Sequence, residues 1–477
     1  MDDLGLLALL PAVVAIALAV LTREVLVSLL LGVVTGSVVL WWHTGAVDDL
    51  NPLTRFLLPA LGTQSFAAVL LIYLWCLGGL VGVWERTGSA RHFAEVAGAR
   101  FVRGPRTALV FAWVIGCVFH QGGTVSTVLA GTTIKPLTDQ HRVSHEELAF
   151  IVDSTASPVA TLLPFNAWPG YVAGLVVGTV PLLATADDGV ALFFASLRYN
   201  FYAMFAVGGT LLFALGWLPW AGSGLRAARE RARSTGALDA PGARPLRPPA
   251  NEERRYARYQ PSLLDFALPL ALLIGVSVGT YAASRLGWLS RGYINEAFVL
   301  CTLSAMGVAW AQGLPGREVL DGFVDGCRDM TVGALILGLA VTLGFVAKEL
   351  HAAQAVVDVV GDGLPAVALP AALTALCMGI ALSTGTSWGT YAVVFPVALP
   401  LAWALHPEPW YLQLCFGAVL GGAVYGDQCS PISDTTVLAS IFTGCDLVDH
   451  VRTQLPPATV AAALGAIAST TLAWWWL

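Results

Sequence analysis

Long apolar runs, separated by short polar turns, follow one another along almost the whole chain. Most are about 20 residues long, which is the length a helix needs to cross the roughly 30 Å hydrocarbon layer of a bilayer. The clearest lie near residues 4–21, 25–42, 64–84, 170–185, 199–219, 262–283, 294–312, 331–346 and 364–382. This pattern predicts an all-α polytopic membrane protein, because a protein with a single anchor would not need so many runs.

Four of the apolar stretches contain a polar interruption rich in glycine or proline. The interruptions lie at 120–127, 153–158, 383–390 and 426–436. In the last of them Pro431 removes a backbone donor and clashes with the preceding turn. Gly421, Gly422 and Gly426 weaken the helix before it, so we expect the chain to unwind here. Unwound backbone at membrane depth is tolerated only inside the protein or beside a polar cavity.

The composition agrees with a membrane protein and argues against nucleic-acid binding, a signal peptide and metal or disulfide roles for the cysteines. The chain is 56% hydrophobic and only 12% charged, with a mean hydropathy of +0.72. A net charge of −6 with only two lysines offers no basic surface for nucleic acid. A cleaved signal peptide begins with a basic segment, whereas here two acids, Asp2 and Asp3, follow Met1. We therefore expect no cleaved signal peptide. The eight cysteines lie mostly in apolar runs without C-x-x-C spacing, which favours small core residues over metal ligands or disulfides.

Residues 221–261 divide the chain into two halves, 1–220 and 262–477. This segment holds nine arginines, four acidic residues and a Pro/Gly-rich centre. It has too little apolar surface to build a core, so we predict a partly disordered linker. Arginines are also frequent between 86 and 106, and arginines beside spans indicate the cytoplasmic side. We therefore expect the linker inside the cell and both termini outside.

The two halves resemble each other in the order of their breaks. A shift of 262 places Gly82 on Gly344 and also Gly123 on Gly385, although these features lie 41 residues apart. A shift of 273 then places Ser157-Pro158 on Ser430-Pro431. Because the first half is expected to start outside and the second inside, the sequence predicts two inverted-topology repeats. Their discontinuous helices would meet near the bilayer midplane, as in secondary transporters.

Several of these motifs carry a family resemblance. The segment Gly-Asp-Gln-Cys-Ser-Pro-Ile-Ser-Asp-Thr-Thr at 426–436, with Gly-Cys-Asp-Leu-Val-Asp-His-Val-Arg-Thr-Gln-Leu-Pro at 444–456, resembles the NhaC family of Na+/H+ antiporters. His-Gln-Gly-Gly-Thr-Val-Ser-Thr at 120–127 and Val-Asp-Ser-Thr-Ala-Ser-Pro at 152–158 are similar to signatures of its first half. The resemblance covers nearly the whole chain apart from the linker.

The resemblance implies an inner-membrane, inverted-repeat exchanger of the ion transporter superfamily and not an enzyme. It leaves the cargo open, because the family also contains malate/lactate exchangers and relatives thought to carry amino acids. Na+ and H+ would be transported or coupling ions, with no resident cofactor. The oligomeric state, including a homodimer, stays open.

The residues at the breaks suit a cation site. Sodium prefers oxygen ligands, which carboxylates, hydroxyls and freed carbonyls supply. A carboxylate that binds either a proton or Na+ excludes one when it holds the other, so alternating access would exchange the two ions. The candidate carboxylates are Asp153, Asp427 and Asp434. The candidate neutral donors are Thr124, Thr127, Ser157, Thr386, Ser387 and Ser430.

Each candidate also has a purely structural interpretation. In that interpretation Asp434 caps the helix that resumes after Pro431, and the other two acids form structural ion pairs. The hydroxyls then only satisfy freed backbone groups. His120 is either a proton relay or a polar core residue. The group Asp446, Asp449, His450 and Arg452 resembles a cytoplasmic polar turn.

Two other functional classes fit the sequence less well. Gly426-Asp427 is similar to the Gly-Asp of intramembrane aspartyl proteases, with Asp153 as a second acid, but a protease has no need of breaks in a duplicated unit. A passive channel would use rings of carbonyls or charges in an oligomer. Within transporters, Na+- or H+-coupled transport of an amino acid or dicarboxylate remains the alternative to Na+/H+ exchange.

Overall fold

The computed structural model describes residues 4–477 apart from 23, 121–122, 164–165, 219–220, 246–258, 290–292, 353–354 and 356–364. The described chain is helical and contains no strand, as predicted. The helices of the first half are α1 (Leu10–Thr22), α2 (Val25–Thr44), α3 (Leu58–Leu61), α4 (Gln64–Ala68), α5 (Leu77–Thr87), α6 (Ser89–Phe101), α7 (Pro105–Val118), α8 (Gly123–Gln140), α9 (His145–Ser154), α10 (Ser157–Ala160), α11 (Trp168–Val176), α12 (Ala186–Ser196) and α13 (Phe201–Leu215). After the linker helix α14 (Ser223–Thr235) follow α15 (Leu263–Arg285), α16 (Ile294–Ala311), α17 (Gly316–Asp329), α18 (Thr331–Glu349), α20 (Leu369–Thr384), α21 (Ser387–Leu405), α22 (Pro409–Cys429), α23 (Asp434–Thr443) and α24 (Leu447–Trp476).

The long apolar helices make this a multi-pass membrane protein. Among the described residues, five helices are long and apolar enough to cross a bilayer. A sixth span is obtained if α12 and α13, which meet at a bend of 53°, are counted together. The run near 170–185 was expected to span but does not, because α11 ends at Val176 and the chain turns at Gly178, whose φ is +77°.

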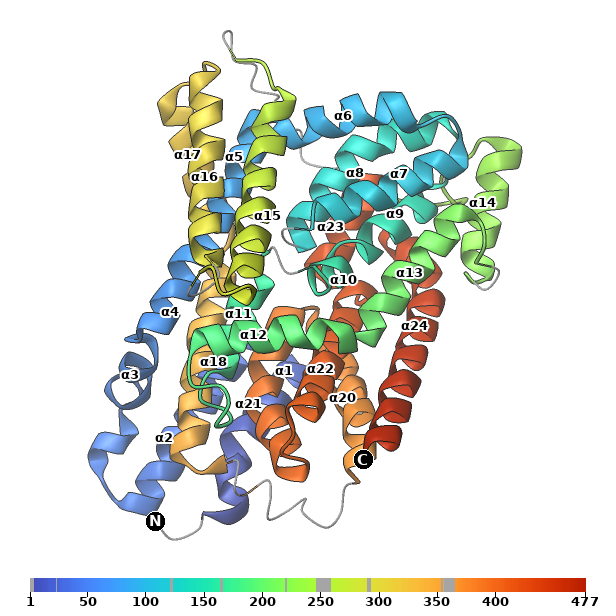
Figure 1. The fold of residues 1–477 in the computed structure, drawn as a ribbon. Helices are drawn as coiled ribbons and strands as arrows, with labels where there is room; N and C mark the ends of the chain where they lie inside the picture. The colour runs from blue at the N-terminus through green and yellow to red at the C-terminus, as the bar shows by residue number, and fades with distance from the viewer. Residues whose placement is uncertain are drawn as a thin grey trace.

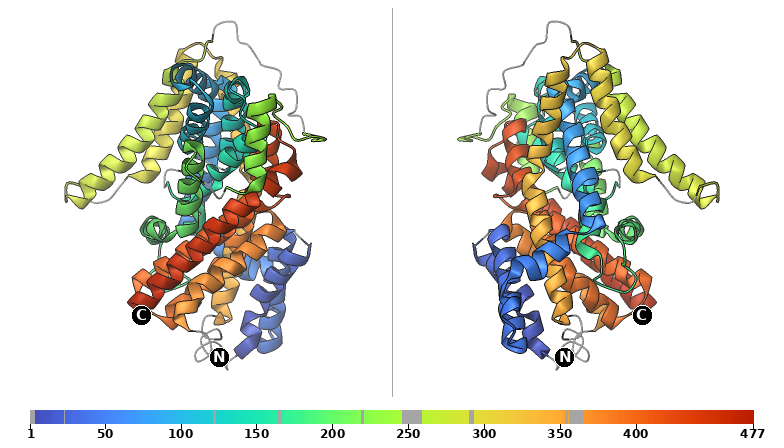
Figure 2. Two further views of the ribbon diagram at one scale, coloured as in Figure 1. Left: turned by 90° about the vertical axis from the view of Figure 1, so that its right-hand side faces the viewer. Right: turned by 90° about the vertical axis from the view of Figure 1, so that its left-hand side faces the viewer.

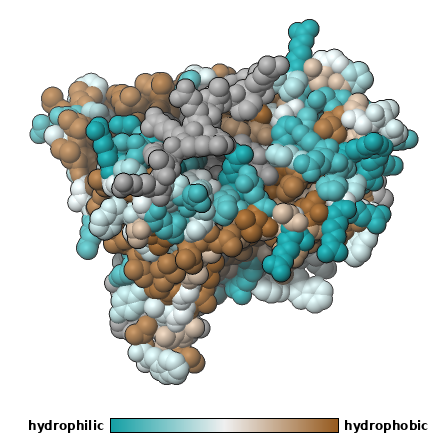
Figure 3. Space-filling model, turned by 90° about the horizontal axis from the view of Figure 1, so that it is seen from above, coloured by the Kyte–Doolittle hydropathy of each residue, from teal (hydrophilic) through white to brown (hydrophobic). Residues whose placement is uncertain are grey.

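The ends of the chain lie on one side of the molecule and the arginine-rich helices lie on the other. In Figures 1 and 2 the N- and C-termini are both at the lower end, whereas α6 and α14 are near the upper end. Figure 3 views that upper end, where hydrophilic side chains gather over much of the face beside hydrophobic ones. This arrangement agrees with the relative placement expected for the linker and the termini. Which end faces the cytoplasm stays a prediction, as does the inverted repeat.

The first part of the linker forms a helix, which was not predicted from the sequence. Residues 223–235 form α14, which buries Leu225, Ala228 and Ala232. Arg229 pairs with Glu147 at 2.6 Å and Arg231 with Glu146 at 2.8 Å, so α14 is fixed to the start of α9. Little in the sequence indicates this helix, because only three apolar residues of α14 are buried, and the ion pairs join segments far apart in the chain. Residues 246–258 of the predicted linker lie outside the described part.

The helix breaks occur where the sequence predicted them. α7 ends before His120, and α9 and α10 are separated by two residues before Ser157-Pro158. α20 ends at Gly385 in the left-handed conformation, with a φ of +71°. α22 ends at Cys429, and α23 begins at Asp434. The discontinuous helices of the predicted fold are therefore present.

The glycines before the last break do not unwind the helix. α22 runs through all of them, and they allow it to pack closely against its neighbours. A Cβ atom on Gly422 would lie 2.5 Å from the carbonyl oxygen of Thr374, and one on Gly426 would lie 2.3 Å from the Cβ of Ala381. Both partners belong to α20, so these glycines set the distance between the two helices. The expectation that they loosen the helix was wrong.

Candidate functional site

The carboxylate of Asp427 is enclosed by three serine hydroxyls. Ser157 and Ser387 each donate to its Oδ2 at 2.8 Å, and Ser433 donates to its Oδ1 at 3.0 Å. Asp427 is only 3% exposed, and the three serines are buried. We call Asp427, Ser157, Ser387 and Ser433 the serine cage. It combines a charged oxygen ligand with three hydroxyl oxygens in a site shielded from water.

The serine cage forms because each serine stands where a helix begins. Ser157 opens α10 and Ser387 opens α21, while Ser433 is the residue before α23. The positive ends of the longer helices α21 and α23 point towards the carboxylate side of the cage and favour negative charge there. Gly385 in its left-handed conformation turns the chain into α21, and the hydroxyl of Thr386 accepts the Gly389 N–H at 3.3 Å. The sequence features that break the helices therefore also position the serines.

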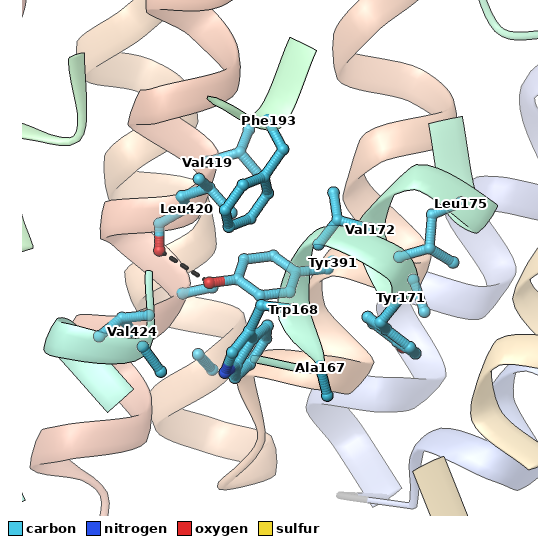
Figure 4. Close-up of a cluster of buried hydrophobic side chains, with 14 of the residues drawn as sticks. Ala167, Trp168, Tyr171, Val172, Leu175, Phe193, Tyr391, Val419, Leu420 and Val424 are labelled. Carbon is cyan, nitrogen blue, oxygen red and sulfur yellow. Dashed lines mark hydrogen bonds between the residues drawn. The ribbon is translucent and has the colours of Figure 1, made fainter. Parts of the chain in front are cut away.

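An aromatic cluster packs against the start of α21. Tyr171 donates to the backbone oxygen of Trp388, next to Ser387, at 2.8 Å. One turn later Tyr391 donates to the backbone oxygen of Leu420 on α22 at 3.0 Å, as Figure 4 shows. The ring of Trp168 contacts both tyrosines, 5.2 Å from the ring of Tyr391 and 6.5 Å from that of Tyr171. The cluster ties α11, α21 and α22 together and fixes the geometry between Ser387 and Asp427.

Asp153 lies in a second buried polar group beside the serine cage. Its Oδ2 is 2.8 Å from Gln454 Nε2, and 3.2 Å from both His450 Nε2 and Thr436 Oγ1. Asp153, His450 and Gln454 are all 0% exposed. Among the described residues, Asp153 Oδ1, His450 Nδ1 and Gln454 Oε1 have no hydrogen-bond partner. Buried polar atoms are seldom left unpaired, so this group has unused capacity for a proton, a water or an ion.

Thr436 and Gln428 connect the two acids. Thr436 Oγ1 lies 3.0 Å from the backbone oxygen of Asp427 and also contacts Asp153. Gln454 hydrogen bonds both Asp153 and the backbone oxygen of Gln428. The side chain of Gln428 donates to Ser154, the neighbour of Asp153, at 2.7 Å. Hydrogen bonds therefore connect Asp153 with the backbone that carries Asp427.

The remaining predicted site residues have different roles. Ser430 accepts the Ile432 N–H at 3.4 Å, and Thr386 caps α21, so both satisfy freed backbone groups. Thr127 is buried on α8. Thr124 also lies on α8, but its side chain is outside the described part. Ser157 and Ser387 are the two predicted hydroxyl residues that the structure brings onto Asp427.

Asp434 occupies the first turn of α23 without being its N-cap. The N-cap is Ser433, and the carboxylate of Asp434 accepts the Thr435 N–H at 2.8 Å. Unlike Asp153 and Asp427, Asp434 is exposed, as are the preceding residues Pro431 and Ile432. Asp434 therefore binds a backbone N–H in the first turn of α23, as a cap would, but the N-cap position belongs to Ser433. Asp434 is exposed, whereas Ser433 is buried.

His120 is a buried polar residue just after the end of α7. It is 5% exposed, and its Nδ1 lies 2.9 Å from the backbone oxygen of Cys117. Its Nε2 has no partner among the described residues.

Sequence reasoning missed four residues of the site. Ser433, Thr436, His450 and Gln454 all contact one of the two buried acids. His450 was assigned to a cytoplasmic polar turn, and that assignment was wrong because α24 already begins at Leu447. His450 and Gln454 are four residues apart and so face the same side of the helix. Two polar residues at this spacing in an apolar helix were the available signal.

Comparison with known proteins agrees with the motifs. A model of the Na+/H+ antiporter family matches residues 159–474. An uncharacterized protein of Haemophilus influenzae is 30% identical over 480 residues, covering 95% of this chain and 88% of the relative. The malate-2H(+)/Na(+)-lactate antiporter of Bacillus subtilis is 31% identical over 197 residues, covering 40% of this chain and 41% of the relative.

The fold also has a solved counterpart. The YdaH transporter of Alcanivorax borkumensis superimposes with a TM-score of 0.53 at 16% identity, covering 95% of this chain and 98% of that structure. At this identity the likeness concerns the fold alone. The family match includes the second-half breaks, where Ser387, Asp427 and Ser433 lie, and it extends over most of the chain. The chain therefore belongs to the Na+/H+ antiporter family, as its motifs predicted.

Proposed function

We propose that this protein is a secondary active transporter that exchanges Na+ for H+ by alternating access. The observation that carries the proposal is the serine cage, in which three hydroxyls from three helix breaks converge on one buried carboxylate. In this proposal the protein lies in the inner membrane with its linker in the cytoplasm.

The serine cage can bind either ion at the same carboxylate. A serine hydroxyl has one hydrogen to donate and two lone pairs to offer. Without a cation, the three hydroxyls donate to Asp427, as observed. When Na+ enters, each hydroxyl turns its hydrogen away and offers a lone pair to the ion, while the carboxylate neutralises it. A proton on Asp427 removes the charge that holds the cation, so the two ions compete.

The position of the ligands suits alternating access. Ser157 belongs to the first half of the chain, whereas Asp427, Ser387 and Ser433 belong to the second. A movement of one half against the other would separate Ser157 from the remaining three ligands. Binding at the interface of two halves that move is the arrangement expected of transporters with broken helices.

Asp153 is not a member of the serine cage but is connected to it. Thr436 hydrogen bonds both Asp153 and the backbone oxygen of Asp427. We propose that its charge, held by His450 and Gln454, contributes to attracting the cation and to coupling the halves.

A second form of the function is coupled exchange of a small organic solute. The name of the Bacillus subtilis relative, a malate-2H(+)/Na(+)-lactate antiporter, favours this form. In that case Na+ in the serine cage would be a coupling ion.

Solid-supported-membrane electrophysiology on purified protein in proteoliposomes tests both forms. The protein is challenged in turn with Na+, pH jumps, malate, lactate and amino acids. Na+/H+ exchange predicts a Na+-dependent proton flux without any organic solute. A response that requires malate, lactate or an amino acid would replace the first form with the second. If no Na+-dependent response is seen either with or without an organic solute, the proposal is contradicted.

A further inference from the structure

A cavity of about 430 Å³ lies between α13 and α24. Most of its wall is apolar, with Met204 and the adjacent glycines Gly208 and Gly209 from α13, and Pro457 and Leu464 from α24. A volume of this size is within the range of sites that hold organic molecules. A Cβ atom placed on either Gly208 or Gly209 would meet nothing within 4 Å, so the two glycines leave this part of the cavity open.

The inner end of the cavity is polar and belongs to the network around the two acids. Ser154 and Gln428 line it, and their side chains are joined by a hydrogen bond of 2.7 Å. Ser154 follows Asp153 and Gln428 follows Asp427 along the chain. Whatever fills the cavity therefore touches the residues that connect the acids, without touching the acids' own ligands.

The mouth of the cavity opens at hydrocarbon depth. Met204 is 38% exposed on α13, and Leu464 is 41% exposed on α24. With a rise of 1.5 Å per residue, Leu464 and Pro457 lie roughly 15 and 26 Å along α24 from Trp474, near its last residue. If Trp474 lies at the membrane surface, a hydrocarbon layer about 30 Å thick contains both residues. The far end of the helix carries the exposed tryptophans 474–476, as expected where a span meets the membrane surface.

We propose that this cavity is a binding site for an acyl chain of a membrane phospholipid. Its wall is apolar and its mouth faces the bilayer interior, so the medium beside it is hydrocarbon and not water. Acyl chains are the most concentrated molecules in that medium, and mass action favours them as occupants. The chain end would pack over Gly208 and Gly209 and reach the Ser154–Gln428 pair. The site is independent of the proposed cargo, because its occupancy does not require ion transport.

Photolabelling with a lipid probe tests the site. Purified protein is reconstituted in phosphatidylethanolamine and phosphatidylglycerol vesicles containing a phospholipid with a diazirine on its acyl chain. After illumination, labelled residues are mapped by mass spectrometry. Label is expected on residues 204–212 and 457–464 above the level on the exposed surface of α15.

Cavity-filling variants give the matched comparison. Gly208→Leu and Gly209→Leu place side chains in the open space, and leucine is a better helix former than glycine. Both should reduce labelling of the cavity to the level on α15. Gly279→Leu is the control, because Gly279 is also exposed with nothing within 4 Å but lies on α15. It should leave cavity labelling unchanged.

Two results would overturn the site. One is cavity labelling that is equal in wild type and in both filled variants. The other is rapid reaction of Gly209→Cys, in a background without native cysteines, with a membrane-impermeant maleimide, which would show that the cavity holds water. Labelling is measured without an ion gradient, so a protein that fails to exchange Na+ for H+ leaves this test intact.

Discussion

His450 Nε2 lies 3.2 Å from Asp153 Oδ2, and the two side chains are both completely buried. They are separated by 297 positions in the chain, and their contact joins α24 to α9. Thr436 and Gln454 complete the surroundings of the carboxylate. The carboxylate of Asp153 is therefore held by three residues of the second half, which lie on α23 and α24.

Removing His450 should loosen this arrangement. His450→Ala removes one of the three hydrogen-bond partners of Asp153, and one such hydrogen bond contributes about 0.5–1.5 kcal/mol to stability. We expect a lower midpoint of thermal unfolding and reduced transport, with partial recovery of both in His450→Gln, which restores a donor. Arg452→Ala, at an exposed position on the same helix, is the control and should behave as wild type. An unchanged unfolding midpoint in His450→Ala would show that the contact contributes nothing to stability.

The three acids should differ in their importance. Asp427→Asn and Asp153→Asn are each expected to abolish ion-coupled transport while the protein still inserts, because the amide keeps the shape but removes the charge. Asp434→Asn should have a milder effect, since Asp434 is exposed and, among the residues that the structure describes, its side chain accepts only the backbone N–H of Thr435. Transport assays in proteoliposomes, with insertion checked by membrane fractionation, decide this. Normal transport by Asp153→Asn and none by Asp434→Asn would place the site in the second half alone.

The serine hydroxyls should contribute to Na+ affinity individually. Ser157→Ala and Ser387→Ala each remove one oxygen ligand and one donor to Asp427. A hydrogen bond to a charged group is worth about 1.5–3 kcal/mol, so we expect apparent Na+ affinity to fall by roughly tenfold or more. Ser430→Ala is the matched control, because within the described part of the chain that hydroxyl hydrogen bonds only the Ile432 N–H. Equal affinity in all three variants would argue against the serine cage.

Competition at Asp427 predicts a specific pH dependence of Na+ binding. If one carboxylate holds either ion, the apparent Na+ dissociation constant should rise as the pH falls. Once the carboxylate is mostly protonated, mass action makes the rise about tenfold per pH unit. Isothermal titration with Na+ over a series of pH values measures it. Na+ binding that stays constant while protons are still exchanged would require a separate proton site.

The contact between His145 and Asp239 of the linker should weaken as the pH rises. His145, the first residue of α9, lies 2.6 Å from Asp239 and 3.2 Å from Asp139, with Lys135 nearby. Burial alone would lower the pKa of His145, but hydrogen bonds to Asp139 and Asp239 outweigh it and raise the pKa above its ordinary value of 6.5. A raised pKa stabilises the folded contact below pH 6.5, and this contribution is lost as the pH rises through the raised value.

Hydrogen exchange of residues 236–240 measures this effect directly. After correction for intrinsic exchange rates, protection should decrease above the raised pKa of His145 in the wild type. Asp239→Asn should reduce protection at low pH and flatten the pH dependence. The pairs Arg229–Glu147 and Arg231–Glu146 should keep α14 protected throughout. Protection that increases with pH would contradict the role assigned to His145.

Much of the architecture follows from the sequence by itself. The length of the apolar runs is set by the thickness of the bilayer, so α2, α15, α16 and α20 appear where hydropathy placed them. The breaks follow from glycine, proline and polar residues that a continuous helix does not tolerate. The same local signals placed Ser157, Ser387 and Asp427 at these breaks.

The tertiary structure decided which of these residues meet. Ser433 and Ser387 both contact Asp427, but only the packing of α21 and α23 against α22 brings them together. His450 was assigned to a polar turn from the sequence, whereas α24 carries it into the core beside Asp153. The glycines of α22 were read as helix breakers, although close packing with α20 explains them. Periodicity and breaks are local properties of the chain, whereas contacts between residues hundreds of positions apart depend on how the helices are arranged in space.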